Sequence, residues 1–256
     1  MPYPQHPKKW REKALVDPKH FFDYLQSQGR APAHVPPSII VGWSSRLRTY
    51  VRNRYKVGEP PQKRPYSGLT IPGTNGRVGF TGDFGIGAPA TVTWVEELLA
   101  LGARQVIGIG IAGSLREELP AGSMVVCTKA LRDEGTSHHY LPYSRYAFPS
   151  TTLTRQIAKA LRADGLPFVE GPSWTVDAPY RETVAEIRRW RKEGILTVEM
   201  EISALFSLAK YRRARAAAVF VISDVVHEDG WRPQFHDARE GLVAAFEAVK
   251  RALAKQ

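Results

Sequence analysis

The chain has 256 residues, of which 43% are hydrophobic, and a formal net charge of +11 at pH 7. This length suits one large α/β domain, and the single cysteine, Cys127, excludes a disulfide framework and a cysteine-rich zinc site. The basic excess favours anionic partners such as phosphates, although a solvated basic surface gives the same excess. No apolar run is long enough for a membrane span and residues 1–10 contain no secretory leader, so we expect a cytoplasmic protein.

Segments with strand and helix patterns alternate along most of the chain. In chain order we predict a helix at 18–28, a strand at 38–42, a helix at 45–55, a Pro- and Gly-rich loop at 59–76, a strand at 77–82, a helix at 90–101, strands at 105–111 and 124–128, helices at 152–163 and 180–193, a strand at 195–198, a helix at 202–212, a strand at 216–222 and a helix at 239–254. This alternation predicts a mainly parallel sheet covered on both faces. We interpret residues 1–37 as an N-terminal extension and residues 38–256 as one domain.

Two glycine clusters follow predicted strands. The segment 108–113 matches the pattern GxGxxG, but a dinucleotide site needs a full helix directly after it. The following segment is short and contains Pro120 and Gly122, so these glycines are better explained by a kinked strand or a backbone that approaches a ligand. The segment 82–89 does lead into a helix, and its backbone N–H groups suit either an anion or a simple turn.

An acidic segment lies in an apolar run at residues 197–206. Glu199 and Glu201 have no basic residue among their neighbours in this run. Buried carboxylates are costly unless they meet a partner, and the hydroxyls of a sugar would satisfy them. A helix start, where acidic residues are favoured by the macrodipole, explains the pattern equally well.

Several segments together resemble the nucleoside phosphorylase family that includes uridine phosphorylase and hexameric purine nucleoside phosphorylase. The resembling segments are GIGAPA at 85–90 followed by EEL at 96–98, GIAGSL at 110–115, DEGTS at 133–137 followed by Tyr140, VEME at 198–201 and SD at 223–224. Their order and spacing match from about residue 38 onwards. The resemblance implies a three-layer α/β/α fold with a mixed, mainly parallel central sheet, and cleavage of an N-glycosidic bond.

The resemblance also implies roles for individual residues. Glu199, Met200 and Glu201 would bind the ribose, where acceptors on the sugar hydroxyls position the sugar and favour an oxocarbenium-like transition state. Asp224 after Ser223 matches the purine branch of the family, in which the aspartate protonates N7 of the leaving base. An ordinary turn cap is the alternative role for Asp224.

The phosphate-binding positions depart from the family pattern. Gly108 stands where the phosphorylases have a phosphate-binding arginine, and their GDPxR loop is Gly42-Trp43-Ser44-Ser45-Arg46 here. The phosphate contacts predicted by the resemblance are Gly42, Arg46, Gly85, Gly110 and Ile111. Related hydrolytic nucleosidases also lack the arginine and use water.

The base-binding segment departs as well. Residues 176–182 align with the DxFY region of the family, but Pro179 replaces the aromatic residue that stacks on the base. Trp174 and Tyr180 offer a stacking face, although both residue types are common in cores. The predicted base contacts are therefore Trp174, Pro179, Tyr180 and Ser223.

The leading hypothesis is phosphorolysis of a purine nucleoside, with inorganic phosphate as co-substrate and with no cofactor or metal. The alternatives are a hydrolytic nucleosidase and a nucleoside-binding homologue without catalysis. A nucleic-acid partner rests only on the net charge and on Arg46, Arg48, Arg52 and Arg54, and is not expected. By resemblance we expect a homo-oligomer, either a dimer or a hexamer, and no membrane partner.

Overall fold

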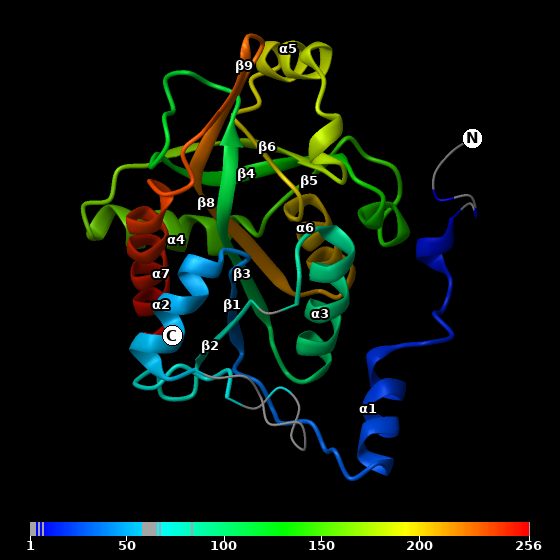
Figure 1. Ribbon diagram of the computed structural model, residues 1–256. Helices are drawn as coiled ribbons and strands as arrows, with labels where there is room; N and C mark the ends of the chain where they lie inside the picture. Colours follow the sequence, from blue (N-terminus) through cyan, green and yellow to red (C-terminus); the bar gives the residue numbers. More distant parts are fainter. Residues whose placement is uncertain are drawn as a thin grey trace.

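The computed structural model describes residues 8–57, 68–82 and 84–255, together with residues 4, 6 and 66. Its strands form one sheet with helices on both faces (Figure 1). The strands are β1 (Ser38–Val41), β2 (Val78–Thr81), β3 (Gln105–Ser114), β4 (Met124–Asp133), β5 (Tyr146–Ala147), β6 (Val169–Val176), β7 (Thr197–Glu199), β8 (Arg215–His227) and β9 (Gly230–Pro233). The helices are α1 (Pro18–Ser27), α2 (Ser45–Tyr55), α3 (Ala88–Ala100), α4 (Thr151–Ala163), α5 (Val184–Lys192), α6 (Ile202–Tyr211) and α7 (Ala238–Ala254), with short 3-10 turns η1 (Lys9–Arg11), η2 (Thr136–His139) and η3 (Pro179–Arg181).

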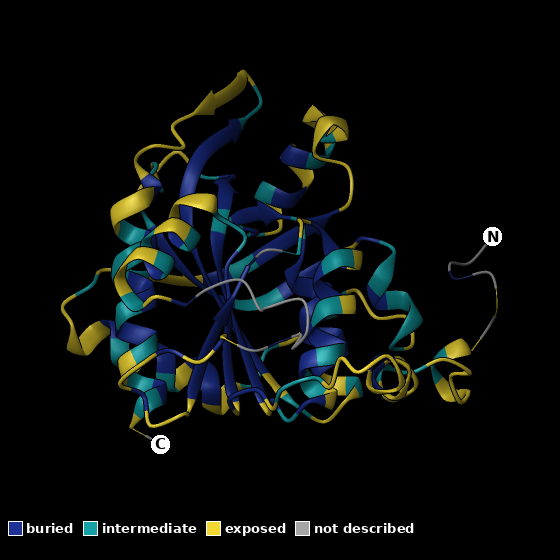
Figure 2. Ribbon diagram, turned by 60° about the horizontal axis from the view of Figure 1, so that its bottom comes forward, coloured by how far each residue is buried: buried dark blue, intermediate teal, exposed yellow. Residues whose placement is uncertain are grey.

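Alternating side chains of the strands build two separate cores. Ile107 and Val219 point to the face covered by α2, α4 and α7, whereas Val106 and Phe220 point to the face covered by α3 and α6. Figure 2 shows the strands buried along most of their length, while the outer sides of the helices are exposed. The predicted three-layer α/β/α architecture is therefore confirmed.

The sheet is mixed, and part of it closes into a ring. β2, β1, β3 and β8 are parallel neighbours in that order. β4 pairs antiparallel with β8, β6 pairs parallel with β4, and β7 pairs parallel with β6. Because β7 also pairs antiparallel with β3, the strands β3, β8, β4, β6 and β7 form a closed circuit of pairings. The two antiparallel pairs of this ring, β4–β8 and β3–β7, arise because β4, β6 and β7 run in the direction opposite to β3 and β8.

The length of β3 and β8 lets one strand pair serve both the open sheet and the ring. Their parallel register extends from Gln105 opposite Arg215 to Ser114 opposite Val225, with a shift between Ala112 and Gly113. A shift of this kind bends the strands locally and re-aims the side chains that follow. The kink proposed for the second glycine cluster thus coincides with the point where β3 turns from the sheet into the ring.

Most predicted elements are present, and the differences have local causes. β6 was not predicted because Gly171 and Pro172 interrupt its strand pattern, and β9 was not predicted because it is short and exposed. The predicted helix at 180–193 begins later, because Thr183 and Glu186 form a capping box at the start of α5. Within the loop predicted at 59–76, residues 59–65 and 67 lie outside the described residues, and Thr70 forms a bridge to Gly79.

The segment interpreted as an N-terminal extension packs against the domain. Asp17 caps α1 by accepting hydrogen bonds from the backbone N–H groups of Lys19 and His20. Phe22 and Leu25 of this helix are buried in a cluster that includes Leu98 of α3. Among the described residues, no helix combines the length and the apolar character that crossing a bilayer requires.

Phe246 of α7 provides a test of the packing. Its ring is fully buried and lies against Tyr50, Tyr55 and Phe80, with the Phe80 ring centroid at 5.6 Å. We predict that Phe246→Ala lowers the free energy of unfolding by about 3–5 kcal/mol, because truncation leaves a cavity among rigid aromatic neighbours. Urea denaturation measures the change. Phe148→Ala is the control, since Phe148 is 63% exposed, and a loss no larger than that of the control would contradict this packing.

Candidate functional site

Strand β3 carries the point at which three strands of the ring meet. Val198 of β7 and Asp224 of β8 both lie opposite Gly113. A Cβ atom built on Gly113 would lie 3.0 Å from Asp224 Oδ2, from Val198 Cγ1 and from Val226 Cγ2. A larger residue at this position would displace the Asp224 carboxylate. Glu199 directly follows Val198, so the acidic segment and Asp224 lie on the two sides of the same strand.

The carboxylate of Glu199 is completely occupied by protein donors. Oε1 accepts hydrogen bonds from Ser173 Oγ at 3.2 Å and Thr175 Oγ1 at 2.5 Å. Oε2 accepts from the backbone N–H groups of Glu201 and Ile202, both at 2.7 Å. Burial raises the pKa of Glu199 to about 7, and these four donors oppose the rise. Because a carboxylate offers about four acceptor positions, this geometry corrects the prediction that Glu199 binds the sugar. It holds the start of α6 instead.

Glu201 is buried as well but keeps acceptor capacity. Its Oε1 accepts a hydrogen bond from the Gly87 N–H at 2.6 Å, which joins the first glycine cluster to the acidic segment. Burial, and next the charge of Glu199, raise the pKa of Glu201 to about 8. The backbone N–H groups of Gly87 and Met200 lower this pKa in part. Met200 itself is half-buried beside the two carboxylates. Of the predicted ribose residues, Glu201 is therefore the carboxylate suited to receive further hydroxyl donors.

Asp224 is buried, with a donor on each carboxylate oxygen. Ser223 Oγ donates to Oδ1 at 2.6 Å, and Trp231 Nε1 donates to Oδ2 at 2.8 Å. A second carboxyl group, that of Glu182, lies near enough for the Asp224 charge to act on it. Burial, and next that charge, raise the pKa of Glu182 to about 7. The surroundings of Asp224 therefore hold two carboxyl groups, one hydroxyl and one indole.

An indole ring covers Gly110 and also Gly108, the position at which the family pattern has its arginine. A Cβ atom built on Gly108 would lie 3.0 Å from Trp43 Cη2, and one built on Gly110 would lie 3.1 Å from Trp43 Cε3. Trp43 Nε1 donates to Thr91 Oγ1 of α3 at 2.9 Å, and the ring contacts Phe84 edge-on. Gly108 and Gly110 therefore provide the close approach that the second glycine cluster predicted, but the approaching group is a side chain of this protein.

The predicted phosphate contacts are only partly brought together. Gly42 directly follows β1 and precedes Trp43, and Gly110 lies beneath the Trp43 ring. Ile111 is half-buried and packs toward the core on the α2 and α7 face. Gly85 lies in the turn before α3 with a φ of +94°. Arg46 is exposed, and its Nη1 donates to the carbonyl of Phe235 at 2.6 Å, at the edge of a groove lined by Arg54 and Arg239.

The predicted base contacts have different environments. Trp174 is fully buried, donates from Nε1 to Asp133 Oδ2 at 2.9 Å and packs near Trp190. This corrects the prediction for Trp174, because a ring enclosed in the core offers no face to a base. Pro179 and Tyr180 form η3 and are exposed, Tyr180 to 98%. Ser223 adjoins Asp224 as predicted from the sequence.

Several residues near the site were not singled out by the sequence. Trp231 lies on the exposed strand β9, and Glu182 lies between two short helical elements, so neither position carries a clear pattern. Ser203 Oγ donates to the buried Glu134 Oε1 at 2.7 Å, and Ser203 N donates to Thr175 Oγ1. Of these residues, only Glu134 could have been identified from the sequence, because it belongs to the DEGTS segment at 133–137. Within the described ranges, no group of three or more His, Cys, Asp or Glu residues has the arrangement of a metal site.

The chain belongs to the phosphorylase superfamily, whose family model matches residues 38–255. Uridine phosphorylase of Treponema pallidum is 32% identical over 221 residues, covering 81% of this chain and 84% of that protein.

Solved structures share the fold. Purine nucleoside phosphorylase from Toxoplasma gondii superposes with a TM-score of 0.72 at 21% identity, covering 87% of this chain and 93% of that one. AMP nucleosidase from Bacteroides thetaiotaomicron superposes with a TM-score of 0.69 at 21% identity, covering 92% of this chain and 97% of that one. The chain therefore belongs to a family of enzymes. The names of its relative and of these structural neighbours refer to nucleosides or nucleotides with different bases.

The raised pKa of Glu201 makes stability depend on pH. Between its ordinary pKa of 4.5 and its folded value of about 8, the folded protein holds a proton that the unfolded chain releases. The free energy of unfolding therefore falls as pH rises through this window. Glu201→Gln imitates the protonated acid, so we predict that the fall between pH 5 and pH 9 shrinks by at least about 1 kcal/mol.

Chemical denaturation across this pH range measures the effect. Glu118→Gln is the control, because Glu118 is exposed and its substitution leaves the buried carboxylates in place. Equal pH dependence in the wild type and Glu201→Gln would show that Glu201 is ionised throughout.

Proposed function

We propose that this protein cleaves the N-glycosidic bond of a purine nucleoside, with Asp224 as the acid that protonates N7 of the leaving base. The observation that carries this proposal is the buried Asp224 carboxylate, which has Ser223 and Trp231 as donors and lies across β3 from the acidic segment. As the proton moves to the base, negative charge develops on Asp224. Two fixed donors already point at that charge, and such preorganised donors favour proton transfer.

Glu201 is the proposed ribose-binding carboxylate. Its burial and its bond to Gly87 fix its direction, and its remaining acceptor positions suit the 2′- and 3′-hydroxyls of a sugar. Acceptors on these hydroxyls favour the positive charge that grows on the sugar as the bond to the base breaks. Met200 adjoins this carboxylate and supplies an apolar contact for the ring.

Inorganic phosphate is the proposed nucleophile, supported by the phosphorylase names of relatives such as the Treponema pallidum enzyme. The glycine turn before α3 and the positive end of that helix are suited to an anion, beside the Gly87 N–H that Glu201 binds. As in the sequence-based hypothesis, we expect a homo-oligomer that works in the cytoplasm without a cofactor.

Hydrolysis by water is the second candidate, and Trp43 is the observation that favours it. The indole lies over Gly108 and Gly110, where the resemblance predicts a phosphate-binding arginine and its neighbours. The ring brings no positive charge to this place, and a cation is the usual partner of a phosphate. A neutral nucleophile does not need one.

Asp224→Asn tests the acid. We predict that it lowers the rate of base release from purine nucleosides by roughly 10²-fold or more, because the amide keeps the shape of the carboxyl group but cannot supply its proton. The assay is chromatography of inosine and guanosine reactions. Asp23→Asn on α1 is the matched control, since the Asp23 side chain is 57% exposed. An unchanged rate in Asp224→Asn would remove the proposed acid.

Phosphate dependence separates the two candidate nucleophiles. We expect base release from inosine, guanosine or adenosine to require phosphate and to yield ribose 1-phosphate. Release without phosphate, with free ribose as product, would instead establish the hydrolytic nucleosidase. Cleavage of uridine alone would contradict the purine assignment. Binding of nucleosides without any release would establish the non-catalytic alternative.

A further inference from the structure

We propose that Trp231 is the platform on which the base of the substrate stacks, and that its indole N–H stabilises Asp224 once the proton has left. This inference rests on the proposed function, because it assigns Trp231 to the base end of the same site. It supplies the aromatic contact that the residues aligned with the family pattern do not provide.

The position of Trp231 relative to Asp224 is the first observation. The indole Nε1 lies 2.8 Å from Asp224 Oδ2, so one edge of the ring is fixed to the proposed acid. The side chain is nevertheless 58% exposed, whereas Asp224 is only 8% exposed. One edge of this indole is thus hydrogen-bonded to a buried acid, while much of the rest of the ring is open. Such a ring is suited to bind a flat ligand within reach of the acid.

The neighbours of Trp231 hold the ring in place. Phe235 packs edge-on against it, with ring centroids 6.0 Å apart. Trp231 lies opposite Val226 in the hairpin formed by β8 and β9. Its orientation is therefore set by strand pairing, by an aromatic neighbour and by the bond to Asp224 together.

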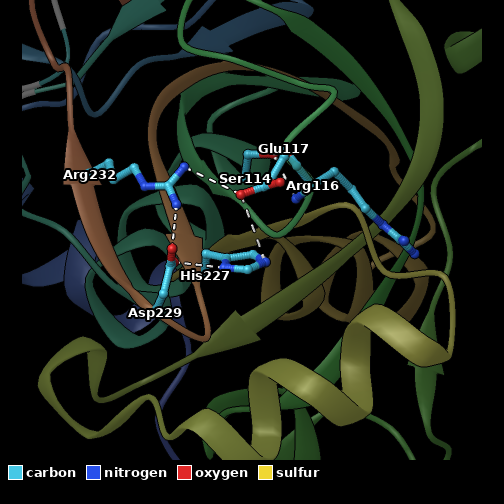
Figure 3. A network of polar contacts seen from close by, with 6 residues as sticks. All are labelled: Ser114, Arg116, Glu117, His227, Asp229 and Arg232. Carbon is cyan, nitrogen blue, oxygen red and sulfur yellow. Dashed lines mark hydrogen bonds and ion pairs between the residues drawn. The ribbon is translucent and has the colours of Figure 1, made fainter.

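An ionic network fixes the β8–β9 hairpin to the turn that follows β3 (Figure 3). Arg232, the neighbour of Trp231, contacts Glu117 at 3.3 Å and Asp229 at 2.7 Å. His227 contacts Asp229 at 2.7 Å and lies 3.9 Å from Glu117. Each such exposed pair contributes little by itself, but a network shared by both strands of a hairpin limits how far that hairpin can move.

The other aromatic candidates are less suited to stacking. Trp174 is fully buried and bonded to Asp133. Tyr180 is 98% exposed, so very little of its side chain contacts the rest of the protein and its ring is not held in any orientation. Pro179 has no aromatic ring. Trp231 combines an open face with a fixed position.

The chemistry assigns two separable contributions to this side chain. Stacking of a base on an aromatic ring contributes to binding of both nucleoside and free base. The N–H donor contributes mainly when Asp224 becomes negatively charged, which happens as the base accepts its proton. Phenylalanine keeps the first contribution and removes the second, while alanine removes both.

The experiment compares Trp231→Phe, Trp231→Ala and Tyr180→Ala with the wild type. For inosine cleavage we expect Trp231→Phe to lower kcat about 10-fold with KM within about 3-fold, and Trp231→Ala to raise KM about 10-fold as well. Calorimetry with hypoxanthine, a free purine base, should show about 10-fold weaker binding to Trp231→Ala and little change in Trp231→Phe. Phe148→Ala, an exposed aromatic truncation at 63% exposure, is the control.

The outcomes distinguish this inference from the proposed function. If the wild type cleaves inosine and Trp231→Ala behaves like it, Trp231 is not the platform, while the proposed function stands. If Tyr180→Ala rather than Trp231→Ala loses hypoxanthine binding, Tyr180 is the stacking residue. If the wild type neither cleaves purine nucleosides nor binds hypoxanthine, both proposals are wrong. Equal losses of kcat in both Trp231 variants with unchanged KM would overturn the stacking role.

Discussion

Four donors converge on the buried carboxylate of Glu199, and the arrangement of the site depends on this contact. Two of the donors are backbone N–H groups at the start of α6, which otherwise have no partner within the helix. The other two are hydroxyls from β6. Glu199 therefore ties α6 to the ring of strands and fixes the backbone of Glu201. Removing one of these partners would leave a buried polar group without a hydrogen bond, which costs more than the bond itself contributes.

Glu201 and Asp224 are two buried carboxyl groups whose different surroundings suit the two roles proposed for them. Glu201 receives backbone N–H groups and lies near the negative Glu199, so burial is only partly offset and sugar hydroxyls would complete its environment. Asp224 receives Ser223 and Trp231, one donor on each carboxylate oxygen. These surroundings agree with the proposed roles, in which Glu201 accepts hydrogen bonds from the sugar and Asp224 gives a proton to the base. Because Gly113 has no side chain, β3 leaves room for the Asp224 carboxylate on one side and for Val198, next to Glu199, on the other.

The sequence predicted what local patterns can carry. The helix at 45–55 matches α2. The segments that contain Glu201 and Asp224 meet at one junction because Gly113 of β3 lies opposite Val198 of β7 on one side and opposite Asp224, inside β8, on the other. The sequence did not predict that protein donors would occupy all the acceptor positions of the Glu199 carboxylate. Two of these donors are the hydroxyls of Ser173 and Thr175, which are distant in sequence and lie on β6, a strand that was not predicted. Trp231 was missed because β9 is short and exposed, and Trp174 was misassigned because burial of a tryptophan depends on the helix packed over it.

Trp43 and Gly108 must be considered as a pair. An arginine at position 108 would place its Cβ atom 2.9 Å from Ile202 Cδ1 and 3.0 Å from Trp43 Cη2, so both of these side chains would have to shift to admit it. Arg48 is a cation close to this ring, and its Nη1 donates to the carbonyls of Trp43 and Gly82, each at 3.1 Å. Its charge is thus used to join the turn after β1 to the turn after β2. Thr91 holds the indole through Nε1, and Arg48 binds the backbone carbonyl of the same residue, so an apolar ring lies over the part of β3 where the family pattern has a cation.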